Sequence, residues 1–183
     1  NPGGKKMEKR IMSAEDIDRS LHRIALQIVE NNHGVANLAI IGIHTGGVFL
    51  ADRIQKLIQD REKIELPTGT LDITLYRDDW SLASQNPIVK KTSIAFPMEE
   101  MVVVLVDDVI FTGRTIRAAM DALMDIGRPQ CIQLAVLVDR GGRELPIQPD
   151  YVGMDIPVKA DEHVHVRLAE KSGCDEIVLV GRN

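Results

Sequence analysis

Two adjacent carboxylates stand at the end of one of the two longest apolar runs in the chain. Residues 102–106 read VVVLV, and Asp107 and Asp108 follow directly. A β-branched run of this kind is typical of a buried parallel strand, and ligands of open α/β sheets bind beyond the carboxyl ends of such strands. Carboxylates accept hydrogen bonds from vicinal hydroxyls, and with water they suit Mg²⁺. Alternatively, Asp107 only caps a loop and Asp108 is only solvated.

The residues after the two aspartates favour a binding role, because they have the composition of a phosphate-binding turn. Backbone N–H groups, two threonine hydroxyls and the positive end of a following helix would converge on one point there. Glycine permits a positive φ and a close approach of the backbone to a ligand. The sequence therefore predicts a site for a ribose 5-phosphate, with its diol on the aspartates. The predicted turn consists of Val109, Ile110, Phe111, Thr112, Gly113, Arg114 and Thr115.

Strand and helix signals alternate along the chain and would place this turn at a sheet edge. Ser13 and Asp16 form a variant capping box, and apolar residues at helical spacing continue to about Asn32. Residues 44–47 read as a turn, and 77–100, a polar stretch containing two prolines, as a long loop. We predict an α/β fold in which a mainly parallel sheet carries helices on both faces. Helices are expected at 13–32, 48–58 and 115–126, and strands at 38–43, 69–76, 102–106, 132–138, 151–152, 164–168 and 177–180.

Composition excludes several classes of protein. The chain has 183 residues with a net charge of −5, so its overall field does not favour a polyanion. Residues 1–6 are expected to be a vector-derived remnant before Met7, with 7–183 as one domain. The longest apolar runs are too short to cross a bilayer, and no signal peptide is recognised. Cys131 and Cys174 are expected to be free thiols in a reducing cytoplasm.

The segment VVVLVDDVIFTGRT resembles the phosphoribosyl-pyrophosphate (PRPP) signature of type I phosphoribosyltransferases. LDITLYRDD, GRTIRAAMDALMDIGRP and IQLAVLVDRGGRELPIQPDYVG resemble the family of bifunctional pyrimidine operon regulatory proteins and uracil phosphoribosyltransferases. The resemblance extends from about Ile11 to Val180. It implies a type I phosphoribosyltransferase fold with a small hood and a long flexible loop, and a homodimer or higher oligomer. It also implies the reaction of uracil with PRPP, in the presence of Mg²⁺, to UMP and pyrophosphate.

The same resemblance assigns roles around PRPP. Asp107 and Asp108 would hold the ribose hydroxyls and are candidate ligands of the PRPP-bound Mg²⁺, while residues 109–115 would cradle the 5-phosphate. Arg77 would meet the departing pyrophosphate when the 77–100 loop closes; the alternative is a surface salt bridge with Asp78 or Asp79. The pyrophosphate loop would be Thr45, Gly46 and Gly47, unless these residues form only a plain turn. The family carries an arginine at the position of Gly46, so this loop lacks one cation.

For the nucleobase pocket, the resemblance points to Val138, Asp139, Arg140 and Val164, although Val164 reads equally well as a core residue. Hypoxanthine or guanine is a weaker alternative to uracil as the base.

The resemblance also implies a second function, in which the protein senses UMP or UTP and binds the leader RNA of pyrimidine genes. Arg19, Arg23 and Arg143 are candidate RNA-binding residues. The RNA-binding members carry polar or basic residues at four positions that are Leu26, Gly142, Met154 and Val158 here. Such side chains contact phosphates or stack on bases, so we expect weak RNA binding.

Overall fold

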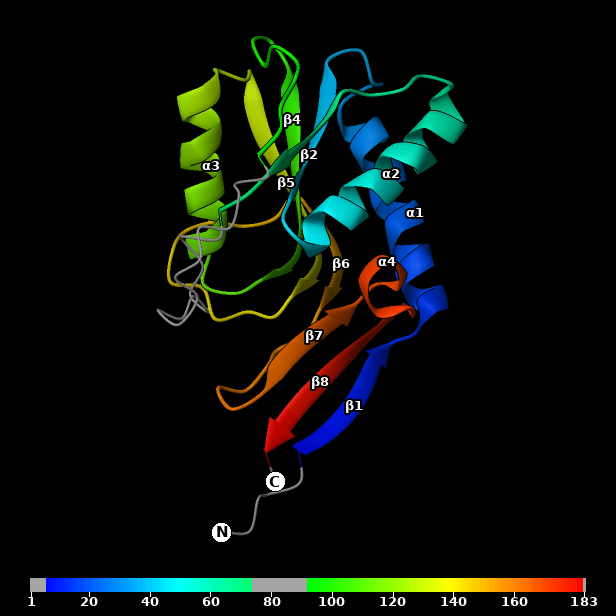
Figure 1. The fold of residues 1–183 in the computed structure, drawn as a ribbon, viewed down its shortest axis with the longest axis vertical. Coiled ribbons are helices and arrows are strands. Elements are labelled where there is room, and N and C mark those ends of the chain that lie inside the picture. The colour runs from blue at the N-terminus through cyan, green and yellow to red at the C-terminus, as the bar shows by residue number, and fades with distance from the viewer. Residues whose placement is uncertain (1–5, 74–91, 183) are drawn as a thin grey trace.

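The computed structural model describes residues 6–73 and 92–182. These residues form a five-stranded sheet of order β3-β2-β4-β5-β6, whose neighbouring strands are all parallel, and a separate antiparallel sheet of order β1-β8-β7, here called the hood (Figure 1). The helices and strands are β1 (Lys6–Met12), α1 (Ala14–Asn31), β2 (Leu38–Ile43), α2 (Gly46–Glu62), β3 (Thr68–Leu71), β4 (Val102–Ile110), α3 (Arg114–Ile126), β5 (Cys131–Asp139), β6 (Tyr151–Asp155), β7 (His163–Arg167), α4 (Ala169–Ser172) and β8 (Glu176–Arg182).

The main sheet is covered on both faces, which explains why its strands read as continuous apolar runs. Helices α1 and α2 lie on one face and α3 on the other (Figure 1). Successive residues of β4 alternate between two cores: Val104 and Val106 pack with α1 and α2, whereas Val103 and Leu105 pack with α3. Strands buried on both faces are expected in a parallel sheet. The predicted α/β architecture is therefore confirmed.

The predicted start of α1 is also confirmed. The Ser13 hydroxyl accepts a hydrogen bond from the Asp16 backbone N–H at 3.2 Å, and Asp16 Oδ2 accepts one from the Ser13 N–H at 2.9 Å. This reciprocal capping box satisfies two backbone groups that have no partner within the helix. The hydrogen bonds from the Ser13 backbone and hydroxyl lower the pKa of Asp16.

Strand β4 is longer than the sequence predicts. It continues past Val106 to Ile110, because Val109 pairs with Val138 and Ile110 with Asp139 of β5. Val109 and Ile110 are consequently strand residues rather than part of the turn, which begins at Phe111. The 44–47 prediction is likewise corrected, since α2 already begins at Gly46. Neither β1 nor the single turn α4 was expected.

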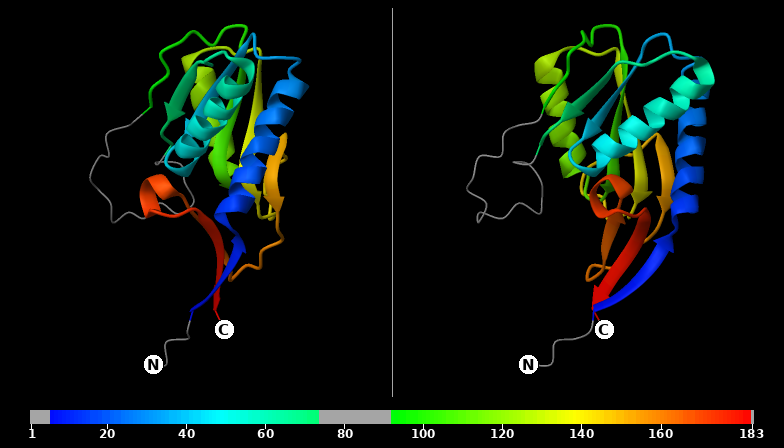
Figure 2. Two further views of the ribbon diagram at one scale, coloured as in Figure 1. Left: turned by 90° about the vertical axis from the view of Figure 1, so that its right-hand side faces the viewer. Right: turned by 45° about the vertical axis from the view of Figure 1, so that its right-hand side comes forward.

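The hood lies beyond the carboxyl ends of the parallel strands, as both views in Figure 2 show. Arg53 of α2 ties it to the main body through paired hydrogen bonds to Glu170 at 2.6 and 2.8 Å and to Asp175 at 2.7 and 2.8 Å. These hydrogen bonds lower the pKa of both carboxyls. Among the described residues, none of the helices has the length and apolarity needed to cross a membrane.

Candidate active site at the end of strand β4

The two carboxylates near the carboxyl end of β4 are held by local backbone hydrogen bonds. Asp107 is buried, with 2% of its surface exposed, and its Oδ1 accepts from the Asp108 N–H at 2.9 Å. Asp108 is half-buried, and its Oδ1 accepts from the Val109 N–H at 2.8 Å. Each carboxylate is therefore oriented by the residue that follows it. The two acidic groups therefore sit on consecutive residues near the carboxyl end of β4, which finishes at Ile110.

The start of α2 lies directly against these carboxylates. A Cβ on Gly47 would stand 2.3 Å from the Val106 carbonyl oxygen, and one on Gly46 would stand 2.5 Å from Asp108 Oδ2. Only glycine permits so close an approach. Thr45 is exposed, follows a cis peptide bond after His44 and makes no side-chain cap to the helix. The fold thus brings the predicted pyrophosphate loop to the predicted ribose-binding residues.

Residues 111–115, here called the phosphate turn, comprise the link from β4 to α3 and the first two residues of α3. Gly113 has φ +94°, which confirms the expected left-handed backbone, and α3 begins at the next residue. Thr112 is buried and its Oγ1 accepts from the Arg114 N–H at 3.2 Å, while Thr115 lies half-buried in the first helical turn. Helix α3 has no side-chain N-cap. Its first N–H groups have no acceptor within the helix, so the turn can receive an anion there.

An arginine and an aromatic ring lie beside this turn. The Arg140 guanidinium carbon is 4.0 Å from the centre of the Phe111 ring, and Arg140 Nη2 donates to the Glu162 carbonyl oxygen at 3.3 Å. Burial lowers the pKa of Arg140. The Phe111 ring also packs directly against Gly142, since a Cβ on Gly142 would stand 2.5 Å from Phe111 Cε2. The pair forms one wall beside the turn, and Arg140 is one of the predicted nucleobase-pocket residues.

The other predicted nucleobase residues are placed differently. Val138 is fully buried, and Val164 packs against the core on the α1 and α2 side. Asp139 is directed to Arg143, whose Nη2 lies 2.5 Å from Asp139 Oδ2. Burial alone would raise the pKa of Asp139, but the hydrogen bonds from Arg143 and from the Gly141 N–H outweigh it, so the pKa is lowered. Among the four predicted residues, Arg140 presents a polar side chain beside the turn.

Two buried side-chain nitrogens have no hydrogen-bond partner among the described residues: His44 Nε2 and Arg140 Nε. Buried polar groups are normally paired, so each of these two nitrogens is a candidate contact for a ligand. His44 precedes the predicted pyrophosphate loop, and Arg140 belongs to the predicted nucleobase pocket. Sequence analysis did not select His44, because a lone histidine before a turn carries no local signal for such a role.

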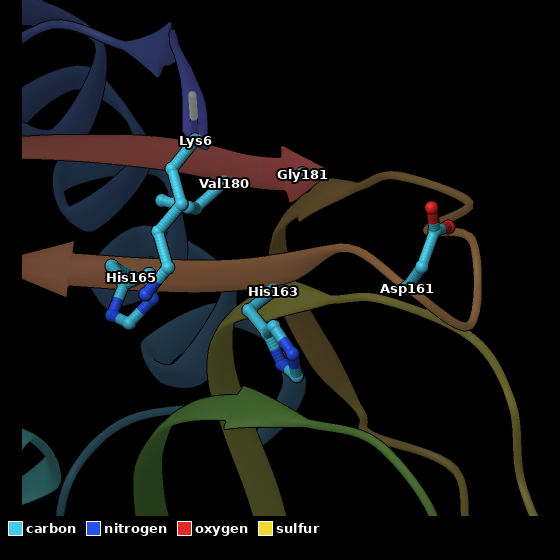
Figure 3. Close-up of a pocket in the computed structure, with 6 residues that line it drawn as sticks. All are labelled: Lys6, Asp161, His163, His165, Val180 and Gly181. Carbon is cyan, nitrogen blue, oxygen red and sulfur yellow. The ribbon is translucent and has the colours of Figure 1, made fainter. Parts of the chain in front are cut away.

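The hood bears a separate hollow of about 290 Å³. His163 and His165 project from the same face of β7, and the Lys6 side chain extends toward His165 (Figure 3). Within 6–73 and 92–182, no three His, Cys, Asp or Glu side chains are grouped so that they could hold a metal ion. The hollow is lined by Lys6, Asp161, His163, His165, Val180 and Gly181.

The three arginines predicted to bind RNA differ in the exposure of their side chains and in the partners that these side chains contact. Arg19 is exposed, but it pairs with Glu15 at 3.4 Å and with Asp16 at 3.8 Å. Arg23 Nη2 donates to the carbonyl oxygens of residues 152 and 153 on β6. The Arg143 side chain is only 15% exposed and is enclosed by protein acceptors.

Arg77, the residue predicted to meet the departing pyrophosphate, falls in 74–91, outside the described residues.

Asp107 and Asp108 are the groups here that suit a hard cation. Mg²⁺ usually keeps several waters and is held by one or two carboxylates together with substrate phosphates. Two adjacent carboxylates beside an anion-binding turn fit that requirement.

Comparison with known proteins agrees with this geometry. Residues 9–171 match the phosphoribosyl transferase domain family. The bifunctional protein PyrR of Syntrophobacter fumaroxidans is 53% identical over 169 residues, which cover 92% of this chain and 91% of the relative. PyrR of Listeria monocytogenes is 49% identical over 182 residues, covering 97% and 100%. The chain belongs to the bifunctional PyrR family of phosphoribosyltransferases.

Solved structures show the same family fold at low sequence identity. The hypoxanthine phosphoribosyltransferase of Trypanosoma cruzi is 18% identical with a TM-score of 0.72, covering 96% of this chain and 97% of that one. The corresponding enzyme of Staphylococcus aureus is 20% identical with a TM-score of 0.68, covering 95% and 91%. These likenesses establish a type I phosphoribosyltransferase fold, which confirms the predicted fold.

Proposed function

We propose that this chain transfers the phosphoribosyl group of PRPP to uracil, forming UMP and pyrophosphate. The observation that carries the proposal is the meeting of Asp107, Asp108, the start of α2 and the phosphate turn at one end of β4. An anion-binding turn and two hydroxyl acceptors are the groups that a ribose 5-phosphate requires. Membership of the PyrR family makes uracil the base to test first.

In this reaction the bond between ribose C1 and pyrophosphate breaks as a bond from C1 to uracil N1 forms, and the N1 proton is released. No protein nucleophile is needed, so positioning and charge stabilisation supply the catalysis. The carboxylates of Asp107 and Asp108 would hold the ribose diol and place negative charge near the sugar as positive charge develops on it. Bound Mg²⁺ would neutralise the departing pyrophosphate, and the same two carboxylates are its candidate protein ligands.

On the nucleobase side, Arg140 would donate to a uracil carbonyl oxygen. Within residues 6–73 and 92–182 its Nε is buried without an acceptor, and its guanidinium carbon lies 4.0 Å from the centre of the Phe111 ring. A carbonyl acceptor from the base would satisfy this donor when the site is occupied. The Phe111 side chain has no polar atom, so its ring can only pack against a ligand and cannot exchange a proton with it.

A direct assay tests this function. The purified protein with PRPP and Mg²⁺ is given uracil, hypoxanthine or guanine, and nucleotide and pyrophosphate are measured. We expect UMP and an equal amount of pyrophosphate with uracil, and little nucleotide with either purine. Absence of UMP at millimolar uracil would refute the proposal, and preferential formation of a purine nucleotide would reassign the base.

A second function, the binding of pyrimidine leader RNA with UMP or UTP as co-ligand, is supported by the bifunctional relatives. The side chains give it less support, since Arg19 is paired with acids and Arg23 with backbone carbonyls. A gel shift of a pyrimidine leader RNA that strengthens with UMP would support regulation. Equal binding of bulk RNA at low salt would contradict it.

A further inference from the structure

The segment that follows β5, residues 140–148, runs along the outer side of the phosphate turn. The Thr112 carbonyl oxygen accepts from the N–H groups of Glu144 at 2.9 Å and Leu145 at 3.2 Å. The Phe111 carbonyl oxygen accepts from Arg143 Nη1 at 2.9 Å. Arg114, which opens α3, adds a 2.6 Å ion pair from its Nε to Glu144. Both carbonyls at the start of the turn are therefore fixed from outside.

Fixing these carbonyls also fixes two N–H groups. In a planar trans peptide, the carbonyl of one residue and the N–H of the next point in opposite directions. Because the carbonyls of Phe111 and Thr112 face the 140–148 segment, the N–H groups of Thr112 and Gly113 face the inner side of the turn. Those are the backbone donors that an anion-binding turn uses. The outer segment thus sets the direction of the donors before a ligand arrives.

Arg143 is itself anchored to the end of the sheet. Its Nη2 contacts Asp139 at 2.5 Å and Gln148 at 3.3 Å, and its Nε donates to the Ile147 carbonyl oxygen at 2.8 Å. Asp139 ends β5 and stands opposite Ile110 in β4. One forked guanidinium therefore joins the last residue of β5 to the carbonyl of Phe111. A lysine ammonium has no comparable planar fork.

The geometry points to Arg143 as a positioning residue for the 5-phosphate turn rather than as an RNA contact. Its guanidinium acts on the ligand through the Phe111 carbonyl and the opposed Thr112 N–H, and it does not touch the ligand itself. This assignment rests on the proposed phosphoribosyl-transfer function, because it supposes that the turn binds a sugar phosphate.

Calorimetry with ribose 5-phosphate and, separately, magnesium pyrophosphate tests the assignment without catalysis. Arg143→Gln is compared with wild type and with Arg61→Gln, a control at the far end of α2 where Arg61 pairs with its neighbour Glu62. We expect Arg143→Gln to weaken ribose 5-phosphate binding by about 10-fold to 100-fold, roughly the factor that one hydrogen bond to a charged group contributes. Pyrophosphate binding should stay unchanged, and the KM for PRPP should rise while that for uracil does not.

Arg143→Lys separates geometry from charge. We expect it to lose most of the ribose 5-phosphate affinity as well; wild-type affinity in this variant would show that charge alone is required and would overturn the proposal. If the variants do not fold, wild-type protein still decides, because ribose 5-phosphate should shift the amide NMR signals of Thr112 and Gly113. Unshifted signals with ligand bound would overturn the assignment. If the wild-type protein binds ribose 5-phosphate in this way but forms no UMP, only the proposed function is contradicted.

Discussion

Gly47→Ala tests whether the start of α2 must lie against the strand that carries the carboxylates. The new Cβ would stand 2.3 Å from the Val106 carbonyl oxygen and 3.0 Å from Asp107 Cα, and both are backbone atoms of β4. A normal carbon–oxygen contact is about 3.3 Å. The first turn of α2 must therefore move away from β4 by about 1 Å. Overpacking of this kind destabilises a protein by about 1–3 kcal/mol, or about 2–12 °C in Tm for a domain of this size.

The same movement separates the proposed pyrophosphate loop from Asp107 and Asp108, and about 1 Å of misplacement costs about 100-fold in rate. We therefore expect kcat/KM for PRPP to fall by about two orders of magnitude at a temperature where the variant is folded. Steady-state kinetics and thermal melts measure the two effects. Gly181→Ala is the matched control, because its Cβ would make only an ordinary 3.4 Å contact with Glu162 Cγ. Wild-type Tm and kinetics in Gly47→Ala would refute the close-contact reasoning.

Two further predictions concern charge. Asp107→Asn and Asp108→Asn keep an acceptor for the backbone N–H groups but lose the negative charge, so each should lower kcat/KM by at least about 10-fold, since a hydrogen bond to a charged group contributes about 1.5–3 kcal/mol. Wild-type kinetics in both variants would show that the ribose assignment is wrong. Arg53→Met should cost about 2 kcal/mol of stability at pH 7, because Glu170 and Asp175 lose the arginine that lowers their pKa values. A lowered pKa stabilises the fold above the ordinary values of 4.5 and 3.8 and ceases to do so as pH falls through the folded-state values. The difference in unfolding free energy between wild type and Arg53→Met should therefore narrow in denaturation experiments from pH 7 to pH 3, and a constant difference would contradict this origin.

Local signals in the sequence were enough to predict the main sheet and its helices. The apolar run 102–106 could only be a buried strand, and Ser13 with Asp16 fixed a helix start through contacts within three residues. The signature at 107–115 also predicted the carboxylates and the left-handed Gly113. In each of these cases, the residues that decide the structure are neighbours in the chain.

Features that depend on distant residues were missed. Strand β1 has the charged sequence KMEKRIM, which carries little strand signal, and it forms because it pairs with β8 at the other end of the chain. Helix α2 begins at Gly46 because glycines let it approach β4, a contact that no local pattern shows. Arg143 resembles any surface arginine in the sequence, and only its distance to the Phe111 carbonyl reveals a different role.

A crystal structure of the protein with UMP tests the central claim most directly. The account predicts the ribose hydroxyls on Asp107 and Asp108, and the 5-phosphate on the N–H groups of the phosphate turn at the start of α3. A nucleotide bound elsewhere, with residues 107–115 facing only solvent, would contradict it.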